Sequence, residues 1–373
     1  MKSFATCSCY RTSGTRSITE QLRTRIAWFR NAAPRGDDPF DDTARLLHEL
    51  RPAYDIDVIV EADAHDFVWK HIQRPWTLCV FELDNTRSHE FMHAYALNYP
   101  GVSIVRSLNV KRLRELLFAS RCLVVEHDMP AEWLRQKHPE LHVRVAPPFG
   151  GSSDVQDADA AVARRTAPVT FAIFDRQTGT TSVAERAFQR AHAANTMFEI
   201  IEPNASPGDM ARADVVVAPG WPPFHAPSSP IFAAMAAGRT VVTMERDATA
   251  EWPAVDPQTW RPRGIVSSGD PIAVTVDPRD EEHSLMLAIR RLAADAALRE
   301  QLGAAARRWW AKNATPARAA AAWRAILDEA VSLSPPARPA DWPTELTADG
   351  TSLARKILSE FGLTPPSRSP ARS

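Results

Sequence analysis

The polar residues best placed for chemistry stand where apolar runs of the sequence end. Asn85 and His89 follow the run LCVFEL. The amide can hydrogen-bond hydroxyl groups, and the imidazole can donate a hydrogen bond or exchange a proton. A histidine near the start of a helix is more often a structural hydrogen-bonding group than a catalyst, so both interpretations of His89 stay open.

A second set of polar residues stands beside expected helix starts in the later part of the chain. Thr178 and Gly179 come just before the helix expected over VAERAFQRAHAA, and Ser228 and Ser229 come just before Pro230. Proline suits a first helical turn. Unpaired backbone N–H groups and the helix dipole favour anions at such positions, although simple capping of the helix would explain the two serines as well.

Strands that alternate with helices must hold these residues in place. Helices are expected over TARLLHEL, SHEFMHAYALNY and KRLRELLFAS in the first half of the chain, and strands at RIAWF, YDIDVIVE, WTLCVFEL, VSIVRS and CLVVEH. Strands joined to helices by short loops predict a parallel sheet that is covered on both faces.

The pattern restarts after a stretch of small and polar residues. Strands at VTFAIF, FEIIE, DVVVAPG and TVVTME alternate with helices, which include one long helical stretch from Glu281 to Lys312. We therefore expect an α/β protein with two Rossmann-like domains that face each other across a cleft. The expected division is a disordered N-terminal tail (1–24), a first domain (25–149), a linker (150–167), a second domain (168–333) and a Pro-rich tail (334–373) with a short helix at Ser352 to Phe361.

Composition excludes several classes of protein. The 373 residues include 44 Lys and Arg against 45 Asp and Glu, so no bulk positive charge points to nucleic acid as a partner. No apolar run approaches the roughly 20 residues that span a bilayer, and the N-terminus lacks the pattern of a secretory signal, so we expect a soluble protein without a transmembrane segment. The oligomeric state stays open.

The cysteines fit a reducing cytoplasm. Four cysteines are too few and too scattered for a disulfide framework in a chain of this size. Cys7 and Cys9 have no second pair at zinc-site spacing, so no metal site is expected. Cys79 and Cys122 stand inside apolar runs and are expected in the core.

Four segments of the sequence resemble the bacterial retaining glycosyltransferases of the glycosyltransferase group 1 family, which have the GT-B fold. The resemblance covers roughly Arg25 to Ala330. The segments are IAWFRNAAPRGDDPFDDTARLLHEL, FELDNTRSHEFMHAYALNYPGVSIVRS, VTFAIFDRQTGTT and DVVVAPGWPPFHAPSSPIFAAMAAGRTVV. The resemblance implies that the first domain binds an acceptor and the second binds a nucleotide sugar.

In the first domain, the resemblance implies catalytic roles for Asn85 and His89. The family's flexible glycine loop is replaced by Gly36 followed by two aspartates, whose carboxylates would repel a diphosphate. The family's later His-Asp pair reads Arg106 and Ser107. Arg106 cannot act as a base, but it could bind an anionic group.

In the second domain, the resemblance implies that Arg176 grips the donor diphosphate. The lysine that accompanies this arginine in the family is replaced by Thr181, and the two family glutamates read His225 and Ala233. The small residues of PIFAAMAAG match the helix that packs close to the sheet and the nucleotide. The candidate donor-binding residues are Arg176, Thr178, Gly179, His225, Ser228 and Ser229.

The expected function is transfer of a sugar from a nucleoside-diphosphate sugar to an unknown acceptor, which could be a glycan, a lipid or a protein. The reaction would need no cofactor and no metal, because Arg176 and a helix N-terminus would stabilise the departing diphosphate. The alternative is a binding or assembly protein that kept this fold and lost the chemistry. A nicotinamide-dependent oxidoreductase is excluded because no G-x-G-x-x-G follows either first strand. Trp309 and Trp310 could suggest stacking on carbohydrate, but the resemblance implies that they pack against the other domain.

Overall fold

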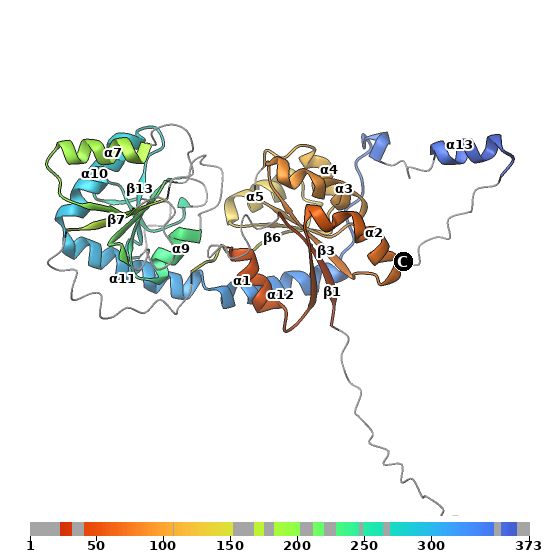
Figure 1. The fold of residues 1–373 in the computed structure, drawn as a ribbon, viewed down its shortest axis with the longest axis horizontal. Coiled ribbons are helices and arrows are strands. Elements are labelled where there is room, and N and C mark those ends of the chain that lie inside the picture. The colour runs from red at the N-terminus through yellow and green to blue at the C-terminus, as the bar shows by residue number, and fades with distance from the viewer. Residues whose placement is uncertain are drawn as a thin grey trace, which may run out of the picture.

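The protein folds into two lobes that lie next to each other along its longest axis (Figure 1). The structure, a computed structural model, describes residues 23–31, 41–106, 108–151, 168–174, 183–201, 212–219, 229–245, 249–263, 269–346 and 352–363. Within these residues, each lobe is built on one β-sheet with helices packed on it. The two α/β lobes confirm the expected fold class.

The first lobe contains a six-stranded sheet in which every pair of neighbouring strands is parallel. The strand order is β2-β1-β3-β4-β5-β6. All six residues of β3 are buried, glutamate included, because helices cover both faces of a parallel sheet. The strands are β1 (Arg25–Phe29), β2 (Asp55–Ile59), β3 (Leu78–Leu83), β4 (Val102–Val105), β5 (Cys122–Val125) and β6 (Val143–Val145).

The helices of the first lobe bury their apolar sides on this sheet. In the first of them, the Asp41 side chain caps the N-terminus by accepting the Ala44 N–H at 2.8 Å, and Leu46, Leu47 and Leu50 are buried. The helices are α1 (Asp42–Leu50), α2 (Phe67–Gln73), α3 (Glu90–Asn98), α4 (Leu113–Ala119) and α5 (Asp128–Lys137), with two 3₁₀ turns, η1 (Glu61–Asp66) and η2 (Arg87–His89).

The second lobe contains a seven-stranded sheet in the order β12-β11-β13-β10-β9-β7-β8. Only the pairing of β12 with β11 is antiparallel among the described strands. The strands are β7 (Thr170–Ile173), β8 (Glu199–Ile201), β9 (Val215–Ala218), β10 (Thr240–Met244), β11 (Ala254–Val255), β12 (Pro262–Arg263) and β13 (Ala273–Val276). The described helices packed with them are α7 (Val183–Ala193), α9 (Ser229–Ala236), α10 (Glu281–Ala294) and α11 (Ala296–Asn313).

The long helical stretch expected from Glu281 to Lys312 is two helices. Asp295 separates α10 from α11, with φ −115° and ψ 90°. Its side chain accepts the Leu298 N–H at 3.0 Å and caps α11. An aspartate competes with the helix backbone for hydrogen bonds, and therefore a second helix starts here.

The helix α12 (Pro316–Ser332) follows the second lobe in sequence but packs on the first sheet (Figure 1). The rings of Trp323 and Trp28 lie 5.3 Å apart, and the Tyr54 hydroxyl donates to the Asp328 carboxylate at 2.7 Å. The core of the first lobe therefore combines residues from early in the chain with residues of α12. The division expected from the sequence assigned α12 to the second domain, which was given as 168–333.

The C-terminal segment begins on the first lobe. The guanidinium of Arg114 donates to both carboxylate oxygens of Asp341, at 2.8 and 2.6 Å. The Trp342 ring packs on the apolar cluster of α4, α5 and β6. A short turn, η4 (Thr344–Leu346), precedes the last helix, α13 (Ser352–Glu360), which covers nearly the same residues as the helix expected in the tail.

Candidate functional site

Polar residues gather at the carboxyl end of β3, in the middle of the first sheet. Asp84 follows the strand, and its Oδ1 accepts the backbone N–H of Asn85 at 2.6 Å. This short bond orders the chain as it leaves the sheet. Asn85 is exposed, so its side chain is available to hydrogen-bond a ligand.

His89 lies four residues further on and is buried. Only 9% of the residue is exposed, and its Nδ1 lies 2.5 Å from the Thr86 hydroxyl. Burial lowers the pKa of His89, against the opposing effect of the carboxylates of Asp84 and Glu82. The ring is therefore held in its neutral form near pH 7, in which it can donate one hydrogen bond and accept another.

An asparagine from the neighbouring strand end joins this turn. Asn31 follows β1, and its Nδ2 donates to the Ser88 hydroxyl at 3.0 Å. The Ser88 hydroxyl also lies 3.0 Å from that of Thr86. Hydrogen bonds therefore connect the ends of β1 and β3 around His89.

Arg106, which could have bound an anionic ligand, is occupied by carboxylates of the protein. Its guanidinium lies 3.5 Å from Glu82 and 3.9 Å from Glu126. Glu82 is buried and also accepts the indole N–H of Trp28 at 2.8 Å. Because two carboxylates already balance its charge, Arg106 stabilises the buried Glu82 instead of offering a free cation to a substrate.

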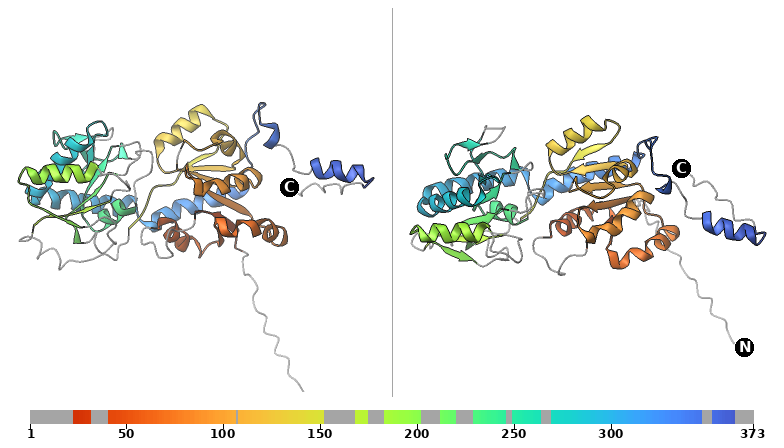
Figure 2. Two further views of the ribbon diagram at one scale, coloured as in Figure 1. Left: turned by 45° about the horizontal axis from the view of Figure 1, so that its top comes forward. Right: turned by 90° about the horizontal axis from the view of Figure 1, so that it is seen from above.

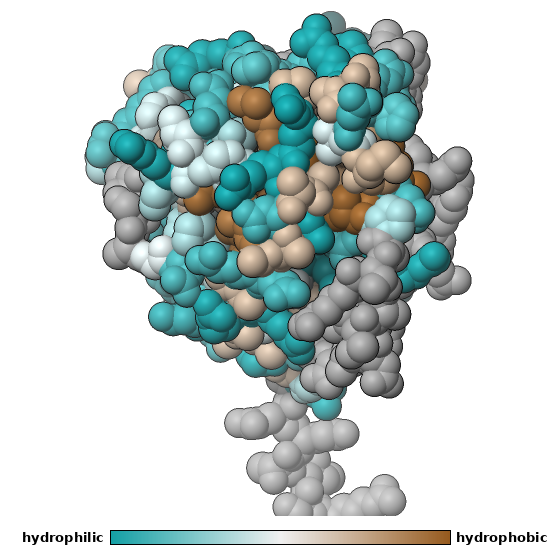
Figure 3. Space-filling view, turned by 90° about the vertical axis from the view of Figure 1, so that its left-hand side faces the viewer, coloured by the Kyte–Doolittle hydropathy of each residue, from teal (hydrophilic) through white to brown (hydrophobic). Residues whose placement is uncertain are grey.

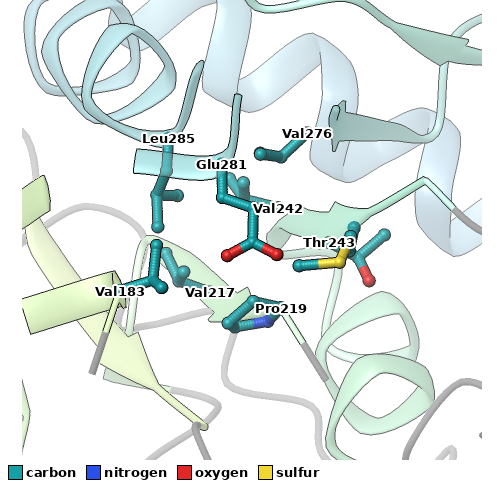
Figure 4. Close-up of a pocket in the computed structure, with 9 residues that line it drawn as sticks. Val183, Val217, Pro219, Val242, Thr243, Val276, Glu281 and Leu285 are labelled. Carbon is teal, nitrogen blue, oxygen red and sulfur yellow. The ribbon is translucent and has the colours of Figure 1, made fainter. Parts of the chain in front are cut away.

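The second sheet has a small hollow at its carboxyl edge (Figure 4). The carboxylate of Glu281, at the start of α10, points into it, and the Thr243 side chain lies nearby. The hollow has room for about one water molecule, so it cannot enclose a nucleotide and could only underlie one. It is lined by Val183, Val217, Pro219, Val242, Thr243, Met244, Val276, Glu281 and Leu285.

Sequence reasoning missed Glu281 because it missed the strand before it. The run AVTV forms β13 between Pro271 and Asp277. A short run rich in Val and Thr that is bounded by proline and aspartate predicts a strand, so the sequence did contain a signal for β13. A carboxylate at this edge can accept hydrogen bonds from ligand hydroxyls.

Most of the predicted donor-binding residues lie outside the described part of the chain. Ser229 is the first residue of α9, although its side chain is not described. Val183, which lines the hollow, begins α7 directly after the loop predicted to grip the diphosphate. Among the residues singled out from the sequence, those that lie outside the described part of the chain are Arg176, Thr178, Gly179, His225 and Ser228, together with Gly36, Thr181, Ser107, Cys7 and Cys9.

Small residues bring α9 and the turn after it close to α11 and to the connector. Ala233 stands where the resembling family has a glutamate, and it is buried against Gly151. A Cβ added to Gly303 of α11 would lie 2.2 Å from the carbonyl oxygen of Gly238, just after α9. The two helices therefore depend on glycine where they approach each other.

The carboxyl edges of the two sheets face each other. Gly150 lies against Asp42, at the start of α1, and against Phe232 of α9. Glu251 follows β10, and its pKa is raised first by burial and then by the carboxylates of Asp128 and Glu132 at the start of α5. Because these residues come from the carboxyl ends of both sheets, the polar turn around His89 and the hollow near Glu281 belong to the edges that meet.

Comparison with known proteins supports this geometry at the level of the fold. No model of a known protein family matches the sequence, and no curated protein matches it. Solved structures do match. The Anabaena protein HepE in complex with UDP superposes with a TM-score of 0.57 at 13% identity, over 82% of this chain and 100% of that chain.

Two further solved structures have similar values. A glycosyltransferase from Rickettsia africae gives a TM-score of 0.55 at 10% identity, over 84% of this chain and 100% of that chain. WaaG, a glycosyltransferase involved in lipopolysaccharide biosynthesis, gives a TM-score of 0.55 at 13% identity, over 81% of this chain and 99% of that chain. This chain has the GT-B fold. At identities this low, the structural similarity establishes the fold alone. The activity has to be argued from the site.

Membrane-spanning helices and metal-binding clusters are both absent from the described residues. None of the helices described is both long enough and apolar enough to cross a bilayer. Among the same residues, no group of three or more His, Cys, Asp or Glu side chains is arranged to hold a metal ion. Cys79 and Cys122 are buried and unpaired, as expected, and burial raises the pKa of each thiol to about 12.

Proposed function

We propose that this protein is a glycosyltransferase that moves a sugar from a nucleoside-diphosphate sugar to an acceptor. One observation carries the proposal: the carboxyl edges of the two sheets meet, and the first of them presents the exposed Asn85 beside the buried His89. In open α/β proteins this edge is where ligands bind. The similarity in fold to a structure solved in complex with UDP supports a nucleotide as the ligand.

Each lobe has a distinct task in this proposal. The first lobe binds the acceptor and the transferred sugar through Asn85 and the neutral ring of His89. The second lobe binds the donor diphosphate through Arg176, Thr178 and Gly179, and through the N-terminus of α9 with Ser228 and Ser229. Positive potential at these groups stabilises the departing diphosphate, so the transfer needs no metal. Retention of configuration is what the resemblance to the retaining family implies.

Within this fold, we infer that the protein belongs to the group 1 family. We also infer that it is located in the cytoplasm. The four resembling segments support the first inference, with DVVVAPGWPPFHAPSSPIFAAMAAGRTVV as the most recognisable match. Two buried, unpaired thiols support the second, because disulfides are rare in a reducing compartment.

A binding protein without catalysis is the second candidate, and Ala233 favours it. The family has a glutamate at this position, whereas this chain has a buried alanine whose backbone lies against Gly151. A methyl group cannot accept a hydrogen bond from a sugar or ribose hydroxyl. Glu281, whose carboxylate points into the hollow of the same lobe, is the described group that could supply this acceptor.

Binding and turnover of nucleotide sugars separate the candidates. Thermal shift and saturation-transfer NMR with UDP-, GDP- and ADP-sugars are the first measurements. A shift with one nucleotide class is expected, and no response to any of them rules out the glycosyltransferase. The released nucleoside diphosphate is then measured in the presence of candidate acceptors. Binding without release, across glycan, lipid and peptide acceptors, favours the non-catalytic alternative.

A further inference from the structure

The exposed large apolar side chains of the described residues are concentrated on two helices. Eleven such side chains are exposed, and six of them belong to α2 or to α13 and the residues just after it. They are Val68, Trp69, Ile72, Ile357, Phe361 and Leu363. Single exposed apolar residues need no explanation, but a concentration on two elements indicates a contact surface.

The exposed face of α2 is rigidly held. Phe67, at the start of the helix, is fully buried and stacks on Trp76 at 4.9 Å. The next residues point outward, with Val68 40%, Trp69 68% and Ile72 66% exposed. The helix is therefore fixed to the first lobe by one side and offers an aromatic ring and two branched chains on the other.

The last helix has a matching apolar side. Ile357 and Phe361 are one helical turn apart, with 46% and 76% of their surface exposed, and Leu363 follows at 57%. Residues four apart share a helix face, so Ile357 and Phe361 form a continuous apolar stripe. An isolated helix of nine residues is marginal in water, and therefore α13 needs a packing partner to be stable.

Both apolar faces lie at the same end of the molecule. The ion pair of Arg114 with Asp341 and the packing of Trp342 hold the start of the C-terminal segment on the first lobe. From there α13 extends beyond the lobe in all three views, at the end where α2 lies (Figures 1 and 2). The opposite end of the molecule carries small hydrophobic groups separated by hydrophilic ones (Figure 3).

We propose that α13 of one copy docks on the exposed face of α2 in a second copy, and that the second copy returns the same contact. A two-fold dimer needs a self-complementary surface, and two faces at one end of each copy form such a surface. The contact is then made twice, which buries both apolar faces in both copies. A second copy is the occupant because α13 extends away from the lobe to which its own segment is attached.

Charge supports the same pairing. The turn η1 precedes α2 and presents the exposed carboxylates of Glu61 and Asp63, whereas that of Asp66 is paired with Lys70 at 3.7 Å. Lys356, on α13, is exposed beside the apolar stripe. Opposite charges around an apolar contact fix its orientation. The acidic turn also disfavours docking of α2 on an anionic membrane surface.

Cysteine cross-linking between two different chains tests the contact. One full-length chain carries Trp69→Cys and the other Phe361→Cys, and both carry Cys7→Ser and Cys9→Ser so that the introduced thiols react. The native Cys79 and Cys122 are buried. Mixing the two chains under mild oxidation is expected to yield a disulfide-linked species at twice the chain mass. A matched mixture of Trp133→Cys with Phe361→Cys is expected to yield little, although Trp133 is exposed on the same lobe.

The oligomeric state in solution gives a second, independent readout. Sedimentation of the unmodified full chain is expected to show a monomer–dimer equilibrium, and Trp69→Lys or Phe361→Lys is expected to raise the dissociation constant at least tenfold. Trp133→Lys should leave it unchanged. All of these positions are exposed, so the folded lobes should tolerate the substitutions. A monomer at every concentration, a dimer insensitive to Trp69→Lys, or a mixture of Trp69→Cys with Phe361→Cys that cross-links no more than the Trp133→Cys control would overturn the proposal.

Discussion

The indole N–H of Trp310 donates to the carbonyl oxygen of Gly150 at 2.8 Å. The backbone N–H of Gly150 donates a second hydrogen bond, to the carbonyl oxygen of Ala314 at 3.3 Å. The end of α11 therefore holds the point at which the chain leaves the first lobe. Trp309, the neighbouring residue, packs within the second lobe against Trp252 at 5.4 Å. The expected contact between the tryptophan pair and the other domain thus involves Trp310 and the connector.

Removing the Trp310 hydrogen bond should destabilise the fold. Trp310→Phe keeps an aromatic ring but leaves the carbonyl of Gly150 without this donor, which costs about 1 to 3 kcal/mol in a buried site. Urea denaturation measures the loss. Trp133→Phe, at an exposed position, is the control and should change stability by less than about 0.5 kcal/mol. Equal effects of the two substitutions would contradict this interpretation of Trp310.

Gly303→Ala tests the close approach of α9 and α11, because the substitution should lower the free energy of unfolding where it would ordinarily raise it. In an ordinary helix interior, alanine stabilises by about 0.5 to 1 kcal/mol relative to glycine. Here the added Cβ would lie 2.2 Å from the Gly238 carbonyl oxygen, so we expect a loss of about 1 to 3 kcal/mol from the forced shift. Ala304→Gly, at an exposed position of the same helix, should show only the ordinary propensity loss of about 0.5 to 1 kcal/mol. A stabilised Gly303→Ala variant would show that the helices can move apart freely.

The lowered pKa of His89 makes stability depend on pH. Because the folded state holds the ring neutral, the unfolded state binds a proton more readily below the ordinary histidine pKa of about 6.5. Stability is therefore fully present above pH 6.5 and decreases as the pH falls towards the lower pKa of the folded state. His71 and His93 have lowered pKa values too, so the wild type must be compared with His89→Asn. Denaturation at pH 7.5 and 5 should show a smaller loss for the variant, and an equal loss would be evidence against a buried neutral ring.

Arg176→Ala tests the donor site on which the proposed function depends. We expect nucleotide-sugar binding to weaken by about 1 to 3 kcal/mol, the range for losing a charged hydrogen bond to a diphosphate. Isothermal titration calorimetry provides the measurement. Arg186→Ala, on α7, removes an arginine that is paired with Glu282 and should leave the affinity unchanged. If the two variants bind equally well, the diphosphate site lies elsewhere.

Local sequence determined the parts of this protein that depend on neighbouring residues. The apolar run LCVFEL became a fully buried strand, and Cys79 within it became part of the core. Asn85 and His89 were placed at a strand's carboxyl end because the order of elements along the chain decides which loop leaves which edge. Periodicity and loop composition carry this information within a few residues, and the α/β class followed from it.

Tertiary structure alone decided which residues that are distant in the sequence pair or pack with one another. Arg106 has the chemistry of an anion-binding residue, but the neighbouring strands bring Glu82 and Glu126 within reach of its charge. Helix α12 follows the second lobe in sequence and yet completes the first core through Trp323. Such outcomes depend on which segments of a long chain meet when apolar surface is buried, and a residue's own type and neighbours do not specify that partner.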